Sequence, residues 1–164
     1  DRFPERESQD KGNVMSQSLA KIYIHTVFST KERENIIGEP HAKDLYRYMA
    51  GILKNLKCPA VIIGGTANHV HVLLRLSRTI TIGDMIGMLK KESSKWIKTK
   101  GKRYSNFQWQ NGYGAFSVAQ VQMEKIQSYI LNQKEHHKKM SFKEEYRILL
   151  NRYRVDFDER YVWG

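Results

Sequence analysis

Two histidines, His69 and His71, are the residues whose types and spacing first point to chemistry. They lie in residues 68–76, a stretch whose apolar and β-branched composition predicts a β-strand. Because alternate side chains of a strand share a face, the two imidazoles project together, about 7 Å apart at the backbone, and can reach one cation. Two half-exposed histidines without a metal would show the same spacing, so the pair indicates a metal site only with a third ligand.

Tyr129 and Gln133 lie four residues apart in a segment with helical periodicity, so both project from one helical surface. Tyr129 stands at the edge of the apolar stripe of Met123, Ile126 and Ile130, where packing half-shields it and substrate can still reach it. A core-edge tyrosine with its hydroxyl in solvent is the alternative. The amide oxygen of Gln133 can complete a mixed nitrogen and oxygen site, which suits Mg²⁺ or Mn²⁺.

His136 and His137 follow on or beside the same helical side. They can contact phosphate, or they can be solvated residues at a helix end, where the helix dipole favours them. We favour the solvated interpretation.

Cleavage of a phosphodiester is the chemistry that these residue types suit. Charge builds on the non-bridging oxygens during attack, and a divalent ion offsets that charge and orients the phosphate. A phenol with a reference pKa of about 10 forms its anion more easily than an alcohol does. Phenolate is also a fair leaving group, so a phosphotyrosine link is reversible and strands can be rejoined without ATP. The chain has no glycine-rich phosphate loop, and we expect no nucleotide cofactor.

The strands that must position these residues follow from the pattern of the chain. Strands are predicted at residues 19–28, 60–63 and 68–76, with Gly64-Gly65 as the turn between the last two. A second hairpin is predicted from residues 107–110 and 113–118, because Asn111-Gly112 between them is the strongest short hairpin signal.

Helices are predicted at residues 40–57, 82–101, 120–137 and 142–153. Thr81 with Asp84 resembles a capping box and opens the second helix, and Ser141 with Glu144 is a full capping box that opens the last. This order of elements predicts a single-domain α+β fold, a ferredoxin-like antiparallel sheet covered by helices.

The chain is strongly basic for its length. Its 164 residues include 28 Lys and Arg against 17 Asp and Glu, a net charge of +11, which favours a polyanionic partner such as nucleic acid. Residues 1–14 are almost all polar, and we expect a disordered extension or a remnant of cloning there, ahead of a catalytic domain at residues 15–164.

A single cysteine, Cys58, excludes an internal disulfide and a zinc site of several cysteines. The longest apolar stretches are far too short to span a membrane, and no signal peptide is recognisable. We therefore expect a cytoplasmic protein with no membrane partner.

Four segments together resemble the single-tyrosine transposases of small insertion sequences, within the HUH superfamily (His, bulky hydrophobe, His). The resemblance covers residues 18–161. The segments are residues 25–33 (HTVFSTKER), His69-Val-His71, residues 108–117 (QWQNGYGAFS), and residues 129–133 (YILNQ) with 135–137 (EHH).

The resemblance implies a metal-dependent tyrosine DNA transposase in which Tyr129 forms a 5′-phosphotyrosine and His69, His71 and Gln133 bind the metal. It also implies a substrate of single-stranded DNA folded into hairpins, and a homodimer in which each site combines the histidines of one chain with the tyrosine of the other. Domesticated relatives that serve chromosomal repeats share these motifs, so both mobile and domesticated elements fit.

A path for the DNA backbone is predicted along Lys91, Lys95 and Lys98, which share one helical face, and onward to Arg103, with Trp96 and Trp109 as stacking partners. A solvated lysine face is the alternative. Two other functions remain open: a non-catalytic ferredoxin-like nucleic-acid-binding module, and another HUH enzyme such as a replication initiator or relaxase.

Overall fold

A four-stranded antiparallel sheet forms the centre of the computed structural model, which describes residues 17–164. Its strands are β1 (Tyr23–Ser29), β2 (Ala60–Thr66), β3 (His69–Arg75) and β4 (Gly114–Val118). The order across the sheet is β2-β3-β1-β4, so the two central strands are β3 and β1. The extension predicted at residues 1–14 lies outside the described residues.

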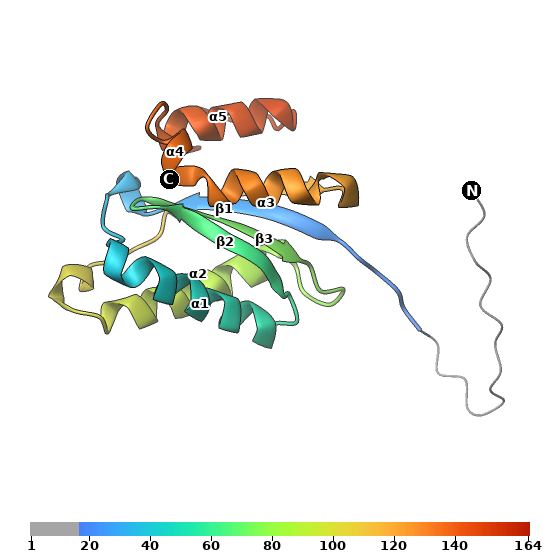
Figure 1. Ribbon diagram of the computed structural model, residues 1–164, viewed down its shortest axis with the longest axis horizontal. Coiled ribbons are helices and arrows are strands. Elements are labelled where there is room, and N and C mark those ends of the chain that lie inside the picture. The colour runs from blue at the N-terminus through green and yellow to red at the C-terminus, as the bar shows by residue number, and fades with distance from the viewer. Residues whose placement is uncertain (1–16) are drawn as a thin grey trace.

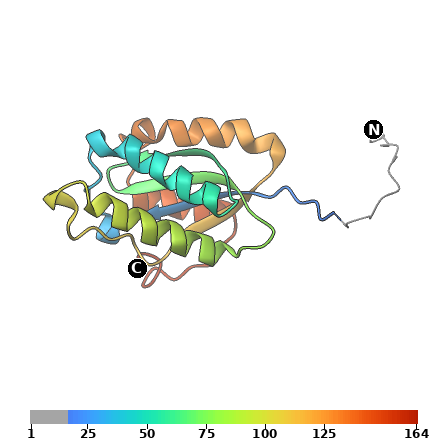
Figure 2. The same ribbon diagram turned by 90° about the horizontal axis from the view of Figure 1, so that it is seen from below.

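Helices cover both faces of this sheet (Figures 1 and 2). One face carries α1 (Glu39–Asn55) and α2 (Ile82–Lys98), and the other carries α3 (Met123–Leu131), α4 (Gln133–His136) and α5 (Phe142–Arg152). Short 3₁₀ helices occur at Lys31–Arg33, Lys102–Tyr104 and Gln120–Gln122. The predicted class, a single ferredoxin-like α+β domain, is confirmed. None of the helices in this described part is long and apolar enough to cross a membrane.

The strand β3 divides its side chains as the alternation predicts. Val70, Val72 and Leu74 are fully buried in the main core beneath α1 and α2. His69 and His71 therefore point to the opposite face, toward α3 and α5. The fold thus places the two histidines on the face of the sheet that α3, α4 and α5 cover.

Gly64 and Gly65 do not form the turn that the sequence predicts between the two strands. Both glycines lie within β2, and the turn to β3 is formed by residues 67–68. A Cβ at residue 64 would lie 2.8 Å from the carbonyl oxygen of Ile130, and one at residue 65 would lie 2.1 Å from that of His69. The glycines are therefore needed because α3 and β3 approach the β2 backbone directly.

The predicted hairpin around Asn111-Gly112 is also wrong. Residues 114–118 form β4, which pairs with β1, whereas residues 107–110 form no strand. The ammonium of Lys90 on α2 donates to the carbonyl oxygens of Gln110 (2.7 Å), Asn111 (3.2 Å) and Gly112 (2.7 Å). These bonds tie the segment to α2. The backbone of Gln108 and Gln110 bonds to Lys31 and Ser29 at the end of β1, and not to β4 as a hairpin would require.

The predicted third helix is interrupted. Residues 120–137 form a 3₁₀ turn, α3 and α4, with a break at Asn132, whose backbone angles (φ −94°, ψ 20°) depart from the α-helix. Asparagine is a weak helix former, which suits such a break. The capping box of Ser141 and Glu144 is confirmed at the start of α5.

Candidate active site

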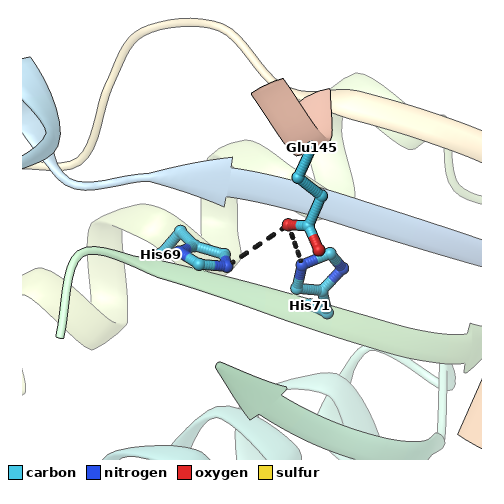
Figure 3. A group of neighbouring side chains, drawn as sticks. All are labelled: His69, His71 and Glu145. Carbon is cyan, nitrogen blue, oxygen red and sulfur yellow. Dashed lines mark hydrogen bonds and ion pairs between the residues drawn. The ribbon is translucent and has the colours of Figure 1, made fainter. Parts of the chain in front are cut away.

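His69 and His71 lie side by side on β3 and point toward α5 (Figure 3). Both side chains are 0% exposed, because α3 and α5 cover this face of the sheet. The alternative of two half-exposed histidines is therefore wrong. The two imidazoles belong to a closed, polar cluster between the sheet and the helices.

Glu145 of α5 is the centre of this cluster. Its Oε1 atom lies 2.9 Å from Nε2 of His71, 3.4 Å from Nε2 of His69 and 3.1 Å from Nε2 of His137. Only 1% of Glu145 is exposed, so this carboxylate is almost completely desolvated. Burial alone would raise its pKa, but hydrogen bonds from His137, His69 and His71 outweigh that effect and hold the pKa below its usual range.

Sequence reasoning missed Glu145. A signal existed, because Glu145 lies within the buried stripe of α5 that Phe142, Tyr146 and Leu149 define. A charged residue in such a stripe needs partners when it is buried. Periodicity alone does not identify those partners, since they come from β3 and α4.

Gln133 joins the same cluster and is fully buried. Its amide nitrogen donates to Oε2 of Glu145 at 3.1 Å, which turns its Oε1 toward Nε2 of His69 (2.9 Å) and Nε2 of His137 (3.1 Å). His137 is not the solvated helix-end residue that we favoured, because only 12% of its side chain is exposed. The protein thus brings three imidazoles, one amide and one carboxylate to one point.

Tyr129 of α3 contacts this cluster through its hydroxyl, which donates to Oε2 of Glu145. Its ring lies 5.7 Å from the ring of His71 and 4.8 Å from that of His136, measured between centroids. Burial and the negative charge of Glu145 raise the pKa of Tyr129 well above its usual range. The phenol is therefore held protonated and hydrogen-bonded in this state.

The donor set of the cluster fits a divalent cation. Nδ1 of His69 lies 2.7 Å from Oδ1 of Asn68, an acceptor, so this nitrogen donates there. Nε2 of the same ring is directed at two oxygen atoms of the cluster, Oε1 of Gln133 at 2.9 Å and Oε1 of Glu145 at 3.4 Å. Ligand atoms of His69, His71 and Glu145 also lie within 4.8 Å of one another. These nitrogen and oxygen atoms are therefore close enough together to coordinate one divalent cation.

A cleft of about 610 Å³ opens beside Tyr129, between α3 and α5. Tyr129, His25 and Glu145 line its inner end, and the exposed basic residues Lys125 and Arg152 line it as well. An elongated polyanion entering this cleft would meet positive charge at Lys125 and Arg152 and the tyrosine hydroxyl farther in.

All of these site residues come from one chain. We expected from the resemblance that the histidines of one chain would meet the tyrosine of its partner. Within the single chain, α3 packs on β2 and β3, and Tyr129 shares Glu145 with His71. This geometry favours a site completed within one subunit. The glycine at position 64 permits that close packing.

The predicted DNA track lies elsewhere. Lys91, Lys95 and Lys98 are exposed on α2, on the opposite side of the sheet from the cleft. Arg103 donates from Nε to the carbonyl oxygen of Ile36 at 3.0 Å. These residues do not contact the candidate site. That they bind DNA stays a prediction, and it would concern a part of the DNA away from the cleaved bond.

The two predicted stacking partners, Trp109 and Trp96, differ in how accessible their rings are to a base. Trp109 is 7% exposed, packs against Phe28 and Phe107, and donates to Ser93, so it cannot stack on a base in this state. Trp96 is half-buried and stacks on Tyr48, with ring centroids 5.1 Å apart.

Comparison with known proteins identifies the family. The sequence model of the IS200-like transposase family matches residues 18–133, more than half of the chain. The chain belongs to this family. The recognition drawn from the four sequence segments is therefore confirmed, and the protein is a member of a transposase family.

Two solved structures have a similar fold. One is a candidate transposase from Deinococcus radiodurans R1, with 23% identity and a TM-score of 0.57 over 76% of this chain and 98% of that chain. The other is a REP-associated tyrosine transposase bound to a REP hairpin, with 11% identity and a TM-score of 0.56 over 77% of this chain and 74% of that chain. A search of the curated proteins finds no match.

Proposed function

We propose that this IS200-like transposase cleaves and rejoins single-stranded DNA through a covalent 5′-phosphotyrosine. The nucleophile is Tyr129, and a divalent cation, Mg²⁺ or Mn²⁺, is held by His69, His71 and Gln133. One observation supports this most. The hydroxyl of Tyr129 and the ring of His71 share the carboxylate of Glu145 at the inner end of a cleft with basic residues in its lining.

The covalent step conserves bonds and protons and needs no cofactor such as ATP to supply energy. The phenolic oxygen of Tyr129 forms a bond to phosphorus, and the bond from phosphorus to the 3′ oxygen of the preceding nucleotide breaks. The phenolic proton leaves toward Oε2 of Glu145, to which the hydroxyl already donates, and the departing 3′ oxygen takes up a proton to become a free hydroxyl. The reverse sequence rejoins a strand.

A bound cation would supply charge neutralisation at the non-bridging oxygens and would orient the phosphate. Glu145 would be a further oxygen ligand for the same ion, because its Oε1 lies close to the imidazole nitrogens of His69 and His71. The combination of imidazole, amide and carboxylate is a mixed set of softer and harder ligands, for which Mn²⁺ is better suited than Mg²⁺.

The DNA that we propose as substrate carries hairpins. The similar structure of a REP-associated tyrosine transposase contains a REP hairpin, and the fold is shared. In this chain, Lys125 and Arg152 at the cleft would contact the phosphates of the strand that leads to Tyr129. We further propose that the protein acts in the cytoplasm as a homodimer in which each subunit contains a complete site.

A covalent-capture assay tests the function. The protein is incubated with a labelled, hairpin-bearing single-stranded DNA and Mn²⁺, and a protein–DNA adduct is sought on a denaturing gel. Tyr129→Phe should abolish the adduct while DNA binding stays near that of the parent, and chelation of the metal should abolish the adduct as well.

The matched control is Tyr153→Phe, because Tyr153 lines the same cleft but stacks on Phe116 and not on the histidine cluster. It should retain the adduct. An adduct that persists in Tyr129→Phe, or that disappears in Tyr153→Phe alone, would remove Tyr129 from the role of nucleophile.

A further inference from the structure

Three cations gather at the end of the sheet where β3 finishes. Lys57 follows α1, Arg75 is the last residue of β3, and Arg78 lies in the loop between β3 and α2. All three line one pocket of about 340 Å³, whose lining also includes the hydroxyl-bearing residues Ser77 and Thr79. No acidic side chain lines this pocket in the part of the chain that the structure describes.

The three cations are exposed and have no carboxylate partner among residues 17–164. The ion pairs in that part of the protein involve other lysines and arginines. Like charges that line one pocket repel one another, so an anion bound between them would be stabilised by all three. The pocket is therefore suited to a phosphate group.

The backbone of Lys57 is strained. Its φ angle of 59° lies in the left-handed region, and its N–H donates to the carbonyl oxygen of Lys54 in the last turn of α1 (3.0 Å). Glycine is the usual residue at such a position just beyond a helix, because a side chain makes the left-handed conformation costly. The chain keeps a lysine here despite that cost, which indicates a role for its side chain.

The pocket lies on the same side of the sheet as the candidate active site. Alternate residues of β3 share a face, so Arg75 projects to the side on which His71 lies. The two residues are four positions apart, about 13 Å along the strand. Between them, Leu73 packs with Met123 and Ile130 of α3.

The cleft beside the nucleophile runs along α3 toward this end of the sheet. The residues that line its α3 side recur at helical spacing: Gln122, Lys125, Ile126 and Tyr129. They follow one side of the helix back to its start, where Met123 packs in one cluster with Tyr23, the strand partner of Arg75. Figure 1 shows the start of α3 and the loop after β3 at the same end of the molecule.

We propose that Lys57, Arg75 and Arg78 form a second phosphate-binding subsite, which holds the backbone of the single-stranded DNA where it leaves the cleft. This inference rests on the proposed function, because it takes the strand that reaches Tyr129 as the ligand. Guanidinium, ammonium and hydroxyl groups donate to phosphate oxygens without reading the bases. The subsite therefore adds affinity for longer single strands and keeps the strand extended along α3.

Binding of unstructured single strands to the whole protein tests the subsite. The probes are fluorescent oligothymidylates of about 4 and about 12 nucleotides, within the range of known single-strand-binding sites. A Tyr129→Phe background with chelator prevents cleavage, and the longer strand should bind this protein more tightly than the shorter one.

Adding Arg75→Gln and Arg78→Gln should weaken binding of the longer strand about tenfold or more at about 0.1 M salt. The slope of log K against log salt concentration should fall by about 1.4, which is about 0.7 for each lost phosphate contact. The shorter strand, which the cleft alone can hold, should lose little affinity.

The matched control is the double variant Lys43→Gln and Arg47→Gln. Both residues are exposed on α1, and Lys43 lies about 18 Å along the helix from its end, so the same charge is removed far from the pocket. This control should keep the length dependence of the parent. An equal loss in the two double variants would mean that net charge alone attracts the strand, and would overturn the subsite. A larger loss for a blunt hairpin without single-stranded arms than for the longer thymidylate would also overturn it, because duplex DNA would then be the ligand.

The variant Lys57→Gly separates binding from folding. Glycine relieves the left-handed strain, so the midpoint of urea unfolding should rise, whereas the affinity for the longer strand should fall because the cation is lost. Higher stability together with weaker binding cannot result from misfolding. Unchanged affinity for the longer strand would refute the three-cation subsite.

The covalent-capture assay separates this inference from the proposed function. With Tyr129 intact and hairpin DNA at saturation, the Arg75→Gln and Arg78→Gln protein should form the adduct at the rate of the parent, since the subsite lies away from the reacting phosphate. If the parent forms the adduct but neither strand length nor the double substitution affects binding, the subsite is refuted and the function stands. If the parent forms no adduct yet shows the length-dependent binding, the covalent function is refuted and the single-strand contact stands.

Discussion

The substitution Gly64→Ala tests the close packing of α3 on β2. A Cβ at residue 64 would lie 2.8 Å from the carbonyl oxygen of Ile130 and 3.0 Å from its Cγ2, whereas ordinary contact begins at 3.4 Å. The nearest atom belongs to the backbone of α3, so a change of side-chain rotamer cannot relieve the clash. The helix or the strand must move by about 0.6 Å.

Such a displacement should reduce both stability and activity. Overpacking of this kind costs about 1–3 kcal/mol of unfolding free energy. Tyr129 precedes Ile130, so the shift is transmitted to the hydroxyl that donates to Glu145. A misplacement of about 1 Å can cost about 100-fold in rate, and a shift of about 0.6 Å should therefore slow adduct formation about tenfold or more.

Urea unfolding and single-turnover adduct formation measure the two effects. The control is Gly51→Ala, because Gly51 is exposed within α1 and no atom lies within 4 Å of a Cβ built there. The same change at this position should stabilise the protein by about 0.5–1 kcal/mol, since alanine is the better helix former, and should leave the rate unchanged. A Gly64→Ala protein as stable and as fast as the parent would show that α3 does not rest on β2 in this way.

Three further predictions concern the elements that bring the site together. Ser141→Ala removes the N-cap of α5 and should cost about 1 kcal/mol in urea unfolding; an unchanged midpoint would contradict the observed cap. Glu145→Gln leaves several buried donors poorly paired, so the metal-free protein should lose about 1–3 kcal/mol of stability and Mn²⁺ should bind more weakly in a calorimetric titration. Unchanged Mn²⁺ affinity would exclude the carboxylate as a ligand. A subunit-exchanged mixture of His69→Ala and Tyr129→Phe should stay inactive in the adduct assay, because each site is complete in one chain, and recovered activity would show sites shared between chains.

Local patterns predicted much of the fold because the relevant physics is local. The alternation in residues 68–76 placed the two histidines on one face, and the capping box at Ser141 placed the start of α5. The hairpin around Asn111-Gly112 failed for the opposite reason. Its preference for a turn is local, but the arm before it bonds to residues 29–31 at the end of β1, and Lys90 of α2 holds the turn residues themselves.

The two glycines at positions 64 and 65 illustrate the same limit. In a sequence, a glycine pair between two strands indicates a turn, because glycine tolerates backbone conformations that other residues avoid. Here both positions must be glycine because a side chain at either one would collide with α3 or β3, which approach the strand there. That reason depends on Ile130, which is remote in the sequence, so periodicity could not reveal it.

The residues of the candidate site also differ in whether the sequence alone could identify them. His69, His71, Tyr129 and Gln133 lie within residues 18–133, the part that matches the family model. Glu145 lies on α5, beyond that match, and it is the residue on which the others converge.

Glu145 belongs to none of the four recognised segments, and its contact with their residues arises from the packing of α5. The face of α5 that carries Glu145 is otherwise apolar, through Phe142, Tyr146 and Leu149, and the burial of those side chains brings the charge into contact with the histidines. The hydrophobic packing of α5 is therefore what desolvates Glu145 and draws its hydrogen-bond partners together, so that substitutions in this stripe should affect the chemistry of the site as well as the stability of the fold.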